Sequence, residues 1–335
     1  MPSHTTPSPI HLAIITITTI LCSLCNISCH RSGSTDDSSL ILASRSDYSV
    51  HRPYDLPDKL QIPLKPANNY LLVQGHVNNE YAGQFLFDTG AAISGVELGV
   101  AGRLNLPRYG QGTASGIGGQ ATISFCRIDN FAIHNLELND NGRFAALNML
   151  GFTRTLEMPL SGIVGYTALG NRVPFCIDQQ NNVLTVYNPV RFQPPVNVEP
   201  VRLHHHHRLP MVSAEIGDDH PIWLVLDTGA DNQLSLPQAC TRLWPDILAV
   251  PFQGPARTTG IGGEVVSSQA WLVSLKLFGL DLRDVPVTFE PHIETLARYD
   301  RPVGRIGNEL LKHFRLTFQP NRQKIWAQWT VDEER

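Results

Sequence analysis

Apolar and polar residues alternate along residues 70–77 and again along 211–216, as they do in strands that bury one face. A short, almost wholly apolar run follows each of these stretches, at 85–88 and at 222–227. Both runs end in Asp-Thr-Gly. The pattern therefore predicts two similar pairs of strands, each leading into a sharp turn.

Further strand-like stretches cover residues 121–133 and 265–277. Two hairpins are predicted, one at 173–187 that turns at Gln-Asn-Asn and one at 314–326 that turns at Pro-Asn-Arg. Helical periodicity is short and local, and it is best at 308–314. These elements predict an all-β protein with small helices.

Three motifs recur in the same order at nearly constant separation, which indicates two copies of one unit. The repeated motifs are Asp-Thr-Gly-Ala at 88–91 and 227–230, Gly-Ile-Gly-Gly at 116–119 and 260–263, and an apolar-Gly ending at 165 and 307.

The repeat and the composition divide the chain into five parts. We expect two β units at 61–190 and 209–330, joined by a solvated linker at 191–208. A flexible tether is expected at 30–60, because that stretch is rich in Ser, Asp, Arg and Pro and has no sustained period. Residues 1–29 are expected to be a leader.

The leader carries an uncharged, mostly apolar stretch at 12–25, and Cys22, Cys25 and Cys29 lie in it or just after it. Its length suits a signal peptide or a lipoprotein leader, which predicts an exported, periplasmic or membrane-anchored protein. Because the first basic residue, Arg31, follows this stretch, a short anchor or a misread start is the alternative.

Composition narrows the function classes. The formal net charge of −4 leaves no basic excess for nucleic acid. Apolar residues make up 42% of the 335 residues and charged residues 17%, so the chain can form real cores. Cys126 and Cys176 could form a disulfide in an oxidising compartment, or they could be two buried thiols on separate strands.

The paired turns carry the candidate chemistry. If the two units pack about a twofold axis, Asp88 and Asp227 can meet, and two adjacent carboxyl groups then share one proton. The protonated carboxyl can polarise an amide carbonyl while the ionised one takes a proton from water. Such a site hydrolyses peptide bonds by general acid–base catalysis, without metal or cofactor.

With these motifs the sequence resembles the retropepsin-like aspartic proteases over about residues 61–330. The resemblance implies the acid-protease fold, with two β lobes on one chain and Asp88 and Asp227 as the catalytic pair. It implies that Thr89 and Thr228 brace the turns. Substrate would be bound by the turns and by two flap tips that close over a peptide. The implied substrate-binding residues are Thr89, Gly90, Ala91, Thr228, Gly229, Ala230, Asp231, Ile117, Gly118, Gly119, Ile261, Gly262 and Gly263.

The two copies depart from one another at two positions. Asp231 matches an aspartate that contacts substrate main chain in retroviral members, whereas the first copy has Ala92 there. Arg305 stands where the family pattern prefers an apolar residue. These departures predict an asymmetric cleft.

Other interpretations carry less weight. The run His204–His207 could bind metal, but adjacent residues on an extended segment point to opposite faces, so no metal site is expected. A Gly-x-Gly-x-x-Ala pattern at 116–121 precedes a strand and not the helix that a dinucleotide site needs. We expect a monomer that acts on peptide or protein. A peptide-binding module without turnover, and an oligomer with sites between chains, are the alternatives.

Overall fold

The computed structural model describes residues 15–17, 20–21, 56–116, 118–138, 142–170, 172–250, 255–260, 263–291 and 301–330. Strands take 56% of the structure and helices 12%, so the protein is mostly β, which is compatible with the predicted all-β class. The predicted leader and tether lie almost wholly outside the described residues, Cys22, Cys25 and Cys29 included. Among the residues that are described, no helix has the length and apolar character to cross a membrane.

The first half of the chain builds an 11-stranded sheet within the described ranges. Its strands, in spatial order, are β11 (Leu136–Glu137), β10 (Phe131–Ile133), β5 (Tyr70–Val77), β6 (Glu80–Asp88), β13 (Gly162–Gly165), β7 (Gly95–Glu97), β12 (Arg143–Leu147), β9 (Gly119–Arg127), β8 (Arg108–Gly116) and β2 (Ile20–Leu21), with β4 (Lys65–Ala67) beside β5.

The second half, joined by β1 from the beginning of the chain, builds a 10-stranded sheet, again counted over the described ranges. Its strands are β1 (Ile15–Ile17), β22 (Pro255–Gly260), β23 (Gly263–Leu277), β24 (Leu280–Glu290), β20 (Leu234–Pro237), β25 (Val303–Gly307), β19 (His220–Asp227), β18 (Leu209–Ile216) and β17 (His204–His206), with β21 (Leu248–Val250) beside β23.

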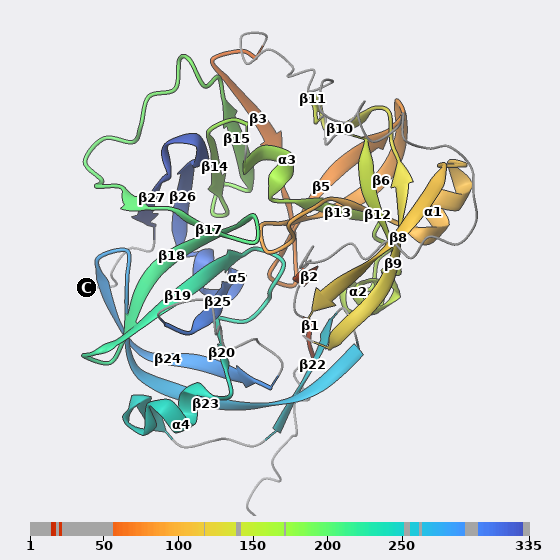
Figure 1. The fold of residues 1–335 in the computed structure, drawn as a ribbon. Helices are drawn as coiled ribbons and strands as arrows, with labels where there is room; N and C mark the ends of the chain where they lie inside the picture. Colours follow the sequence, from red (N-terminus) through yellow and green to blue (C-terminus); the bar gives the residue numbers. More distant parts are fainter. Residues whose placement is uncertain are drawn as a thin grey trace, which may run out of the picture.

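The two predicted hairpins do not stay with their own halves, because they join in a third sheet of six strands among the described residues. Phe175 and Phe318 stack across it with ring centroids 4.6 Å apart. Its strands are β16 (Val201–Arg202), β27 (Lys324–Trp329), β26 (Phe314–Gln319), β14 (Phe175–Asp178), β15 (Val183–Tyr187) and β3 (Lys59–Pro63). Figure 1 shows this sheet beside both halves.

The helices are short, as predicted, and lie at strand ends. The Glu97 carboxylate caps the first of them by accepting from the N–H groups of Gly99 and Val100. The helices are α1 (Leu98–Arg103), α2 (Leu150–Leu156), α3 (Thr167–Gly170), α4 (Cys240–Leu243) and α5 (Asn308–Leu311), with 3₁₀ turns at Pro245–Ile247 and Pro320–Arg322.

Two predicted boundaries need correction. The segment 191–208 is not simply a linker, because β16 and β17 add to the edges of two sheets. The last two residues of the range predicted as a tether, 59 and 60, belong to β3, which begins at Lys59 and pairs with β15. In both cases an open sheet edge recruits residues whose own pattern gives little strand signal.

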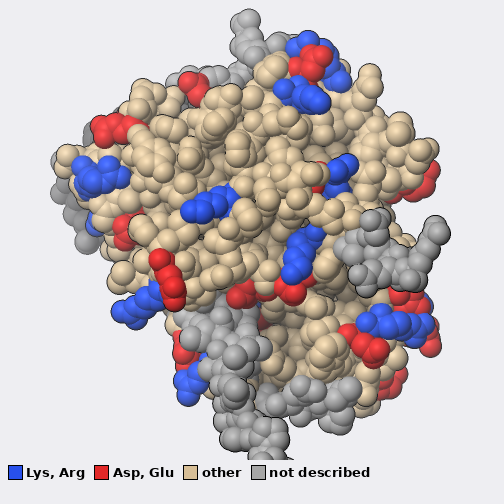
Figure 2. All heavy atoms as spheres, turned by 180° about the vertical axis from the view of Figure 1, so that it is seen from behind, with Lys and Arg blue, Asp and Glu red and all other residues tan. Residues whose placement is uncertain are grey.

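Cys126 on β9 and Cys176 on β14 are both buried and free, so the buried-thiol alternative is the one observed. Burial raises the pKa of the Cys126 thiol to about 11. On the face shown in Figure 2, basic and acidic side chains are interspersed, which agrees with the absence of a basic excess in the composition.

Candidate active site

Asp88 and Asp227 occupy corresponding positions in the two halves. Each ends a central strand, β6 or β19, and each is paired in parallel with a buried glycine, Gly165 on β13 or Gly307 on β25. The residues before each aspartate are apolar and buried. Each half therefore places one carboxyl group at the end of a core strand, where its central turn begins.

The two turns are bonded to each other through their threonines. The Thr89 N–H donates to Thr228 Oγ1 over 2.9 Å, and the Thr228 N–H donates to Thr89 Oγ1 over 3.0 Å. Each hydroxyl then donates across the junction, Thr89 to the Leu226 carbonyl and Thr228 to the Phe87 carbonyl. This buried exchange fixes the two turns relative to one another, in the bracing arrangement expected for these threonines.

The same junction brings the carboxyl groups together. A Cβ atom on Gly90 would overlap the carboxyl group of Asp227, and one on Gly229 would overlap that of Asp88. Each glycine N–H donates to the Oδ1 of the aspartate in its own turn, over 2.8 Å for Gly90 and 3.0 Å for Gly229. Only glycine lets each turn approach the opposite carboxyl group this closely.

Burial and the neighbouring Asp227 carboxylate raise the pKa of Asp88 well above its ordinary value. The N–H groups of Gly90 and Ala91 and the Arg305 guanidinium oppose this rise. Asp88 Oδ2 is buried and makes no hydrogen bond within the described structure. The arrangement therefore favours a pair that retains a proton at a pH where an isolated aspartate has lost it.

The residues after each Asp-Thr-Gly are also fixed. Ala91 and Ala230 are fully buried, and their carbonyl oxygens accept from the N–H groups of Tyr166 and Asn308. Asp231 hydrogen-bonds the hydroxyl of Tyr70, a buried residue from the other half. Burial, followed by the Asp231 charge, raises the pKa of Tyr70 well above its usual range.

Two long hairpins, β8–β9 and β22–β23, carry the predicted flap tips. Gly119 and Gly263 have φ angles of 107° and 120°, which L-residues with a side chain rarely adopt, so these tight turns favour glycine. Gly118 precedes Gly119 in the first tip. Ile117, Ile261 and Gly262 lie outside the described residues.

A buried ion pair lies in the second half. Arg305 bonds Glu290, with their side chains 3% and 0% exposed. Ser235 Oγ donates to Glu290 Oε1 over 2.7 Å, and Asn232 Nδ2 donates to Ser235 Oγ over 2.7 Å. The predicted departure at Arg305 is thus part of a polar network that begins five residues after Asp227.

Sequence reasoning did not identify Tyr70, Ser235 or Glu290. Their signal is visible once the two copies are aligned on their strand registers. Tyr70 then corresponds to Leu209, Ser235 to Gly95, and Glu290 to Leu147. In each case a residue with a polar group in one copy corresponds to a residue without one in the other.

The histidine run is partly embedded in the fold. His204–His206 form β17, and His205 Nε2 lies 3.0 Å from the Tyr166 hydroxyl. His206 is 5% exposed, and burial lowers its pKa to about 4, so the expectation of a solvated run is wrong for this residue. Nowhere in the described ranges do three or more His, Cys, Asp or Glu side chains gather as metal ligands would.

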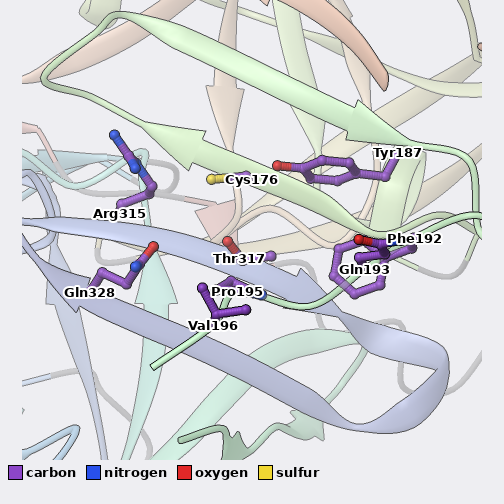
Figure 3. Close-up of a pocket in the computed structure, with 9 residues that line it drawn as sticks. All are labelled: Cys176, Tyr187, Phe192, Gln193, Pro195, Val196, Arg315, Thr317 and Gln328. Atoms are coloured by element: carbon purple, nitrogen blue, oxygen red, sulfur yellow. The ribbon is translucent and has the colours of Figure 1, made fainter. Parts of the chain in front are cut away.

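A separate pocket of about 290 Å³ opens on the six-stranded sheet (Figure 3). Cys176, Tyr187 and Arg315 line it, and neither aspartate of the paired turns does. The charge of Arg315 is already engaged, because its Nε donates to Asp178 over 2.7 Å. The pocket is therefore separate from the paired turns, and its one basic side chain already has an acidic partner.

The model of a family described as aspartyl protease matches residues 73–166. The match includes the first Asp-Thr-Gly turn, the first flap hairpin and β13, and it ends before the second turn. It supports an aspartic-protease family and, in general terms, a hydrolase of the protease class. A search of curated proteins finds no match to the chain.

Proposed function

We propose that this chain is an aspartic endopeptidase with one active site between its two halves, in the retropepsin-like arrangement of two lobes on one chain. The observation that carries the proposal is the cross-bonded pair of turns, in which each glycine packs on the opposite carboxyl group. Asp88 and Asp227 are the catalytic pair, and the working unit is the monomer.

In the proposed reaction, the ionised carboxylate takes a proton from a water molecule, and the oxygen of that water attacks the peptide carbonyl carbon. The protonated carboxyl gives its proton to the carbonyl oxygen, which produces a tetrahedral diol. The carboxyl that took the proton from water then gives it to the amide nitrogen, and the other carboxylate takes a proton from a hydroxyl of the diol as the C–N bond breaks. A carboxylic acid and an amine leave, and the pair again holds one proton. The raised pKa of Asp88 supports this division of labour, because one carboxyl must remain protonated.

The strand pairing at the flaps supports an extended peptide as the ligand. β1 runs parallel to β22, and β2 runs antiparallel to β8. Figure 1 shows β1 beside β22. If β8 and β22 are related by a twofold axis, any peptide that crosses the axis must run parallel to one and antiparallel to the other. The chain's own residues 15–17 and 20–21 have this geometry, so both flap strands can accept main-chain hydrogen bonding from an added strand.

Within this proposal, the turn residues Gly90 and Gly229 and the flap glycines Gly118, Gly119 and Gly263 contact the substrate main chain. Asp231 contributes on one side only, since Ala92 occupies the corresponding position. Its bond to Tyr70 holds its carboxyl group between the halves.

The test is digestion of a mixed peptide library by the full chain between pH 4 and 7, read by mass spectrometry. Asp88→Asn is compared with Asp218→Asn, a matched change at a fully exposed side chain. We expect cleavage by the wild type and by Asp218→Asn, and none by Asp88→Asn. Peptide binding without cleavage by the wild type would instead favour the binding-module alternative.

A further inference from the structure

The strand register places a charged pair on the same face of the second half as its aspartate. Register partners in a sheet share a face, and so do residues two apart on one strand. Arg305 is the partner of Val225, which lies two residues before Asp227. Ser235 is the partner of both Arg305 and Thr288, and Glu290 lies two residues after Thr288.

The corresponding face of the first half is apolar. There Ile163 pairs with Leu86, two residues before Asp88, and Gly95 lies between Ile163 and the strand that carries Leu147. Leu86, Leu147 and Ile163 belong to one buried apolar cluster. In the second half, Glu290 thus stands at the position of Leu147, and Arg305 stands at the position of Ile163.

The charge of Arg305 is incompletely satisfied by its partner. Its Nη2 donates to Glu290, but its Nε and Nη1 are buried and without an acceptor in the described structure. Buried donors of a charged group are normally all bonded, and a guanidinium in a low-dielectric region exerts a strong field on its surroundings. The pair is therefore a fixed charge distribution that only the second half carries, on the sheet face that it shares with Asp227.

Both aspartates lie within reach of this field. The positive charge of Arg305 opposes the rise in the pKa of Asp88. The negative charge of Asp227 adds to the burial that raises the pKa of Glu290. Among the described residues, Tyr70 from β5 also interacts with the charges of both aspartates, and its hydroxyl bonds Asp231 from the second turn.

We propose that the buried Arg305–Glu290 pair is a positioning element that makes the two singly protonated forms of the Asp88–Asp227 pair unequal in free energy. This inference rests on the proposed function, because it concerns the protonation of that site. The more stable form is populated at the expense of the doubly protonated and doubly ionised forms. The pair thereby widens the pH range in which exactly one proton is held between the two aspartates.

The first-half residues supply the test variant. The double change Glu290→Leu/Arg305→Ile removes the charges and installs the residues found at 147 and 163. We compare kcat/KM against pH for the full chain, with Glu215→Leu/Lys276→Met, which removes an exposed ion pair of the same half, as control. The expected result is a narrower profile, with the acid limb moved up and the alkaline limb moved down by about 0.5 pH unit each.

A purely structural role would lower the rate without moving the limbs in opposite directions. Unmoved limbs, or limbs that shift together with unchanged width, would overturn the inference. Should the double variant fail to fold, Glu290→Gln removes only the negative charge, and both limbs then move to lower pH. Unchanged limbs in Glu290→Gln would also contradict the inference.

A readout without turnover separates this inference from the proposed function. ¹³C NMR of Asp carboxyl carbons follows the two titration steps of the pair in the full chain. A smaller interval between the steps in the double variant supports the positioning role even if the wild type cleaves no peptide. An equal interval in both proteins overturns that role, whether or not cleavage is observed.

Discussion

The two halves of this molecule have corresponding strand registers around their aspartates, yet they differ in what lies beside them. In the first half, Ile163 and Leu147 flank Gly95 in an apolar cluster. In the second, Arg305 and Glu290 flank Ser235 in a buried polar network. The turns themselves remain equivalent, with matching threonine and glycine contacts.

This difference separates two requirements. Joining the halves needs equal turns, because each threonine must complete the bonds of the other. The surroundings of the aspartates carry no such constraint, so one half can bear charges that the other lacks. Substitutions at corresponding residues of the two halves test whether the turns are equivalent while the surroundings of the aspartates differ.

The largest stability effect is expected where the halves differ most. Arg305→Met leaves the Glu290 carboxylate buried without its partner, at a cost of about 3–5 kcal/mol in unfolding free energy. The corresponding change Ile163→Met should cost less than about 1.5 kcal/mol. Urea denaturation measures both, and equal losses would mean that the ion pair contributes no more than apolar packing.

Glu290→Leu/Arg305→Ile should recover most of the stability lost in Arg305→Met. A buried pair exchanged for apolar residues of similar volume is often neutral. A double variant as unstable as the single one would show that the polar network, and not charge balance, maintains this region.

Where the halves are alike, the effects should match. Thr89→Val and Thr228→Val each remove a hydroxyl that donates to a carbonyl and accepts an N–H across the junction. Two buried groups lose their partners in each variant, so each should cost about 2–4 kcal/mol. Thermal unfolding compares them, and a loss confined to one variant would contradict the equivalence of the turns.

The aspartate pair should destabilise the fold near neutral pH. Because the pKa of Asp88 is raised in the folded state, the native protein holds a proton that the unfolded chain has released. Stability then falls as pH rises from the ordinary value of 3.8 through the raised one. The stability of Asp88→Asn relative to the wild type should therefore be higher at pH 7 than at pH 3.

Denaturation of the wild type and Asp88→Asn at the two pH values measures this difference. Asp227→Asn should show a gain of the same sign, since either amide ends the repulsion between two carboxyl groups. A stability difference from wild type that does not change with pH would contradict the raised pKa.

The smallest effect is expected at the other departure from equivalence. Tyr70→Phe removes the hydroxyl bonded to Asp231 and should cost about 1 kcal/mol. Leu209→Met, at the corresponding position, provides the matched control. Unfolding free energies from urea titrations compare the two, and an unchanged Tyr70→Phe would show that the hydrogen bond contributes nothing net.

The sequence was informative where periodicity and motif coincide. The predicted strand at 70–77 matches β5 at both ends, and both Asp-Thr-Gly turns lie at the ends of buried strands. The predicted strand at 121–133 instead divides into β9 and β10. There the Asn78 side chain accepts from the N–H groups of Asp129 and Asn130 and interrupts the strand.

The pattern of apolar and polar positions along the chain does not predict contacts between residues that are far apart in the sequence. The sequence marks Arg305 as a departure from the family pattern, but its partner Glu290 is identified only when β24, β20 and β25 are known to be neighbours. The sequence also does not predict that the two hairpins join in one sheet, because neither hairpin's residues indicate which strand it will pair with.

The account rests on the claim that the two turns form a single site, and a double-mutant cycle in kcat/KM tests it most directly. Asp88→Asn and Asp227→Asn should each lower kcat/KM by about 10³-fold or more, and the double variant should be no slower than either. Such non-additivity is expected of two groups that share one proton in one reaction. Substantial activity in either single variant, or losses that multiply in the double variant, would contradict the claim.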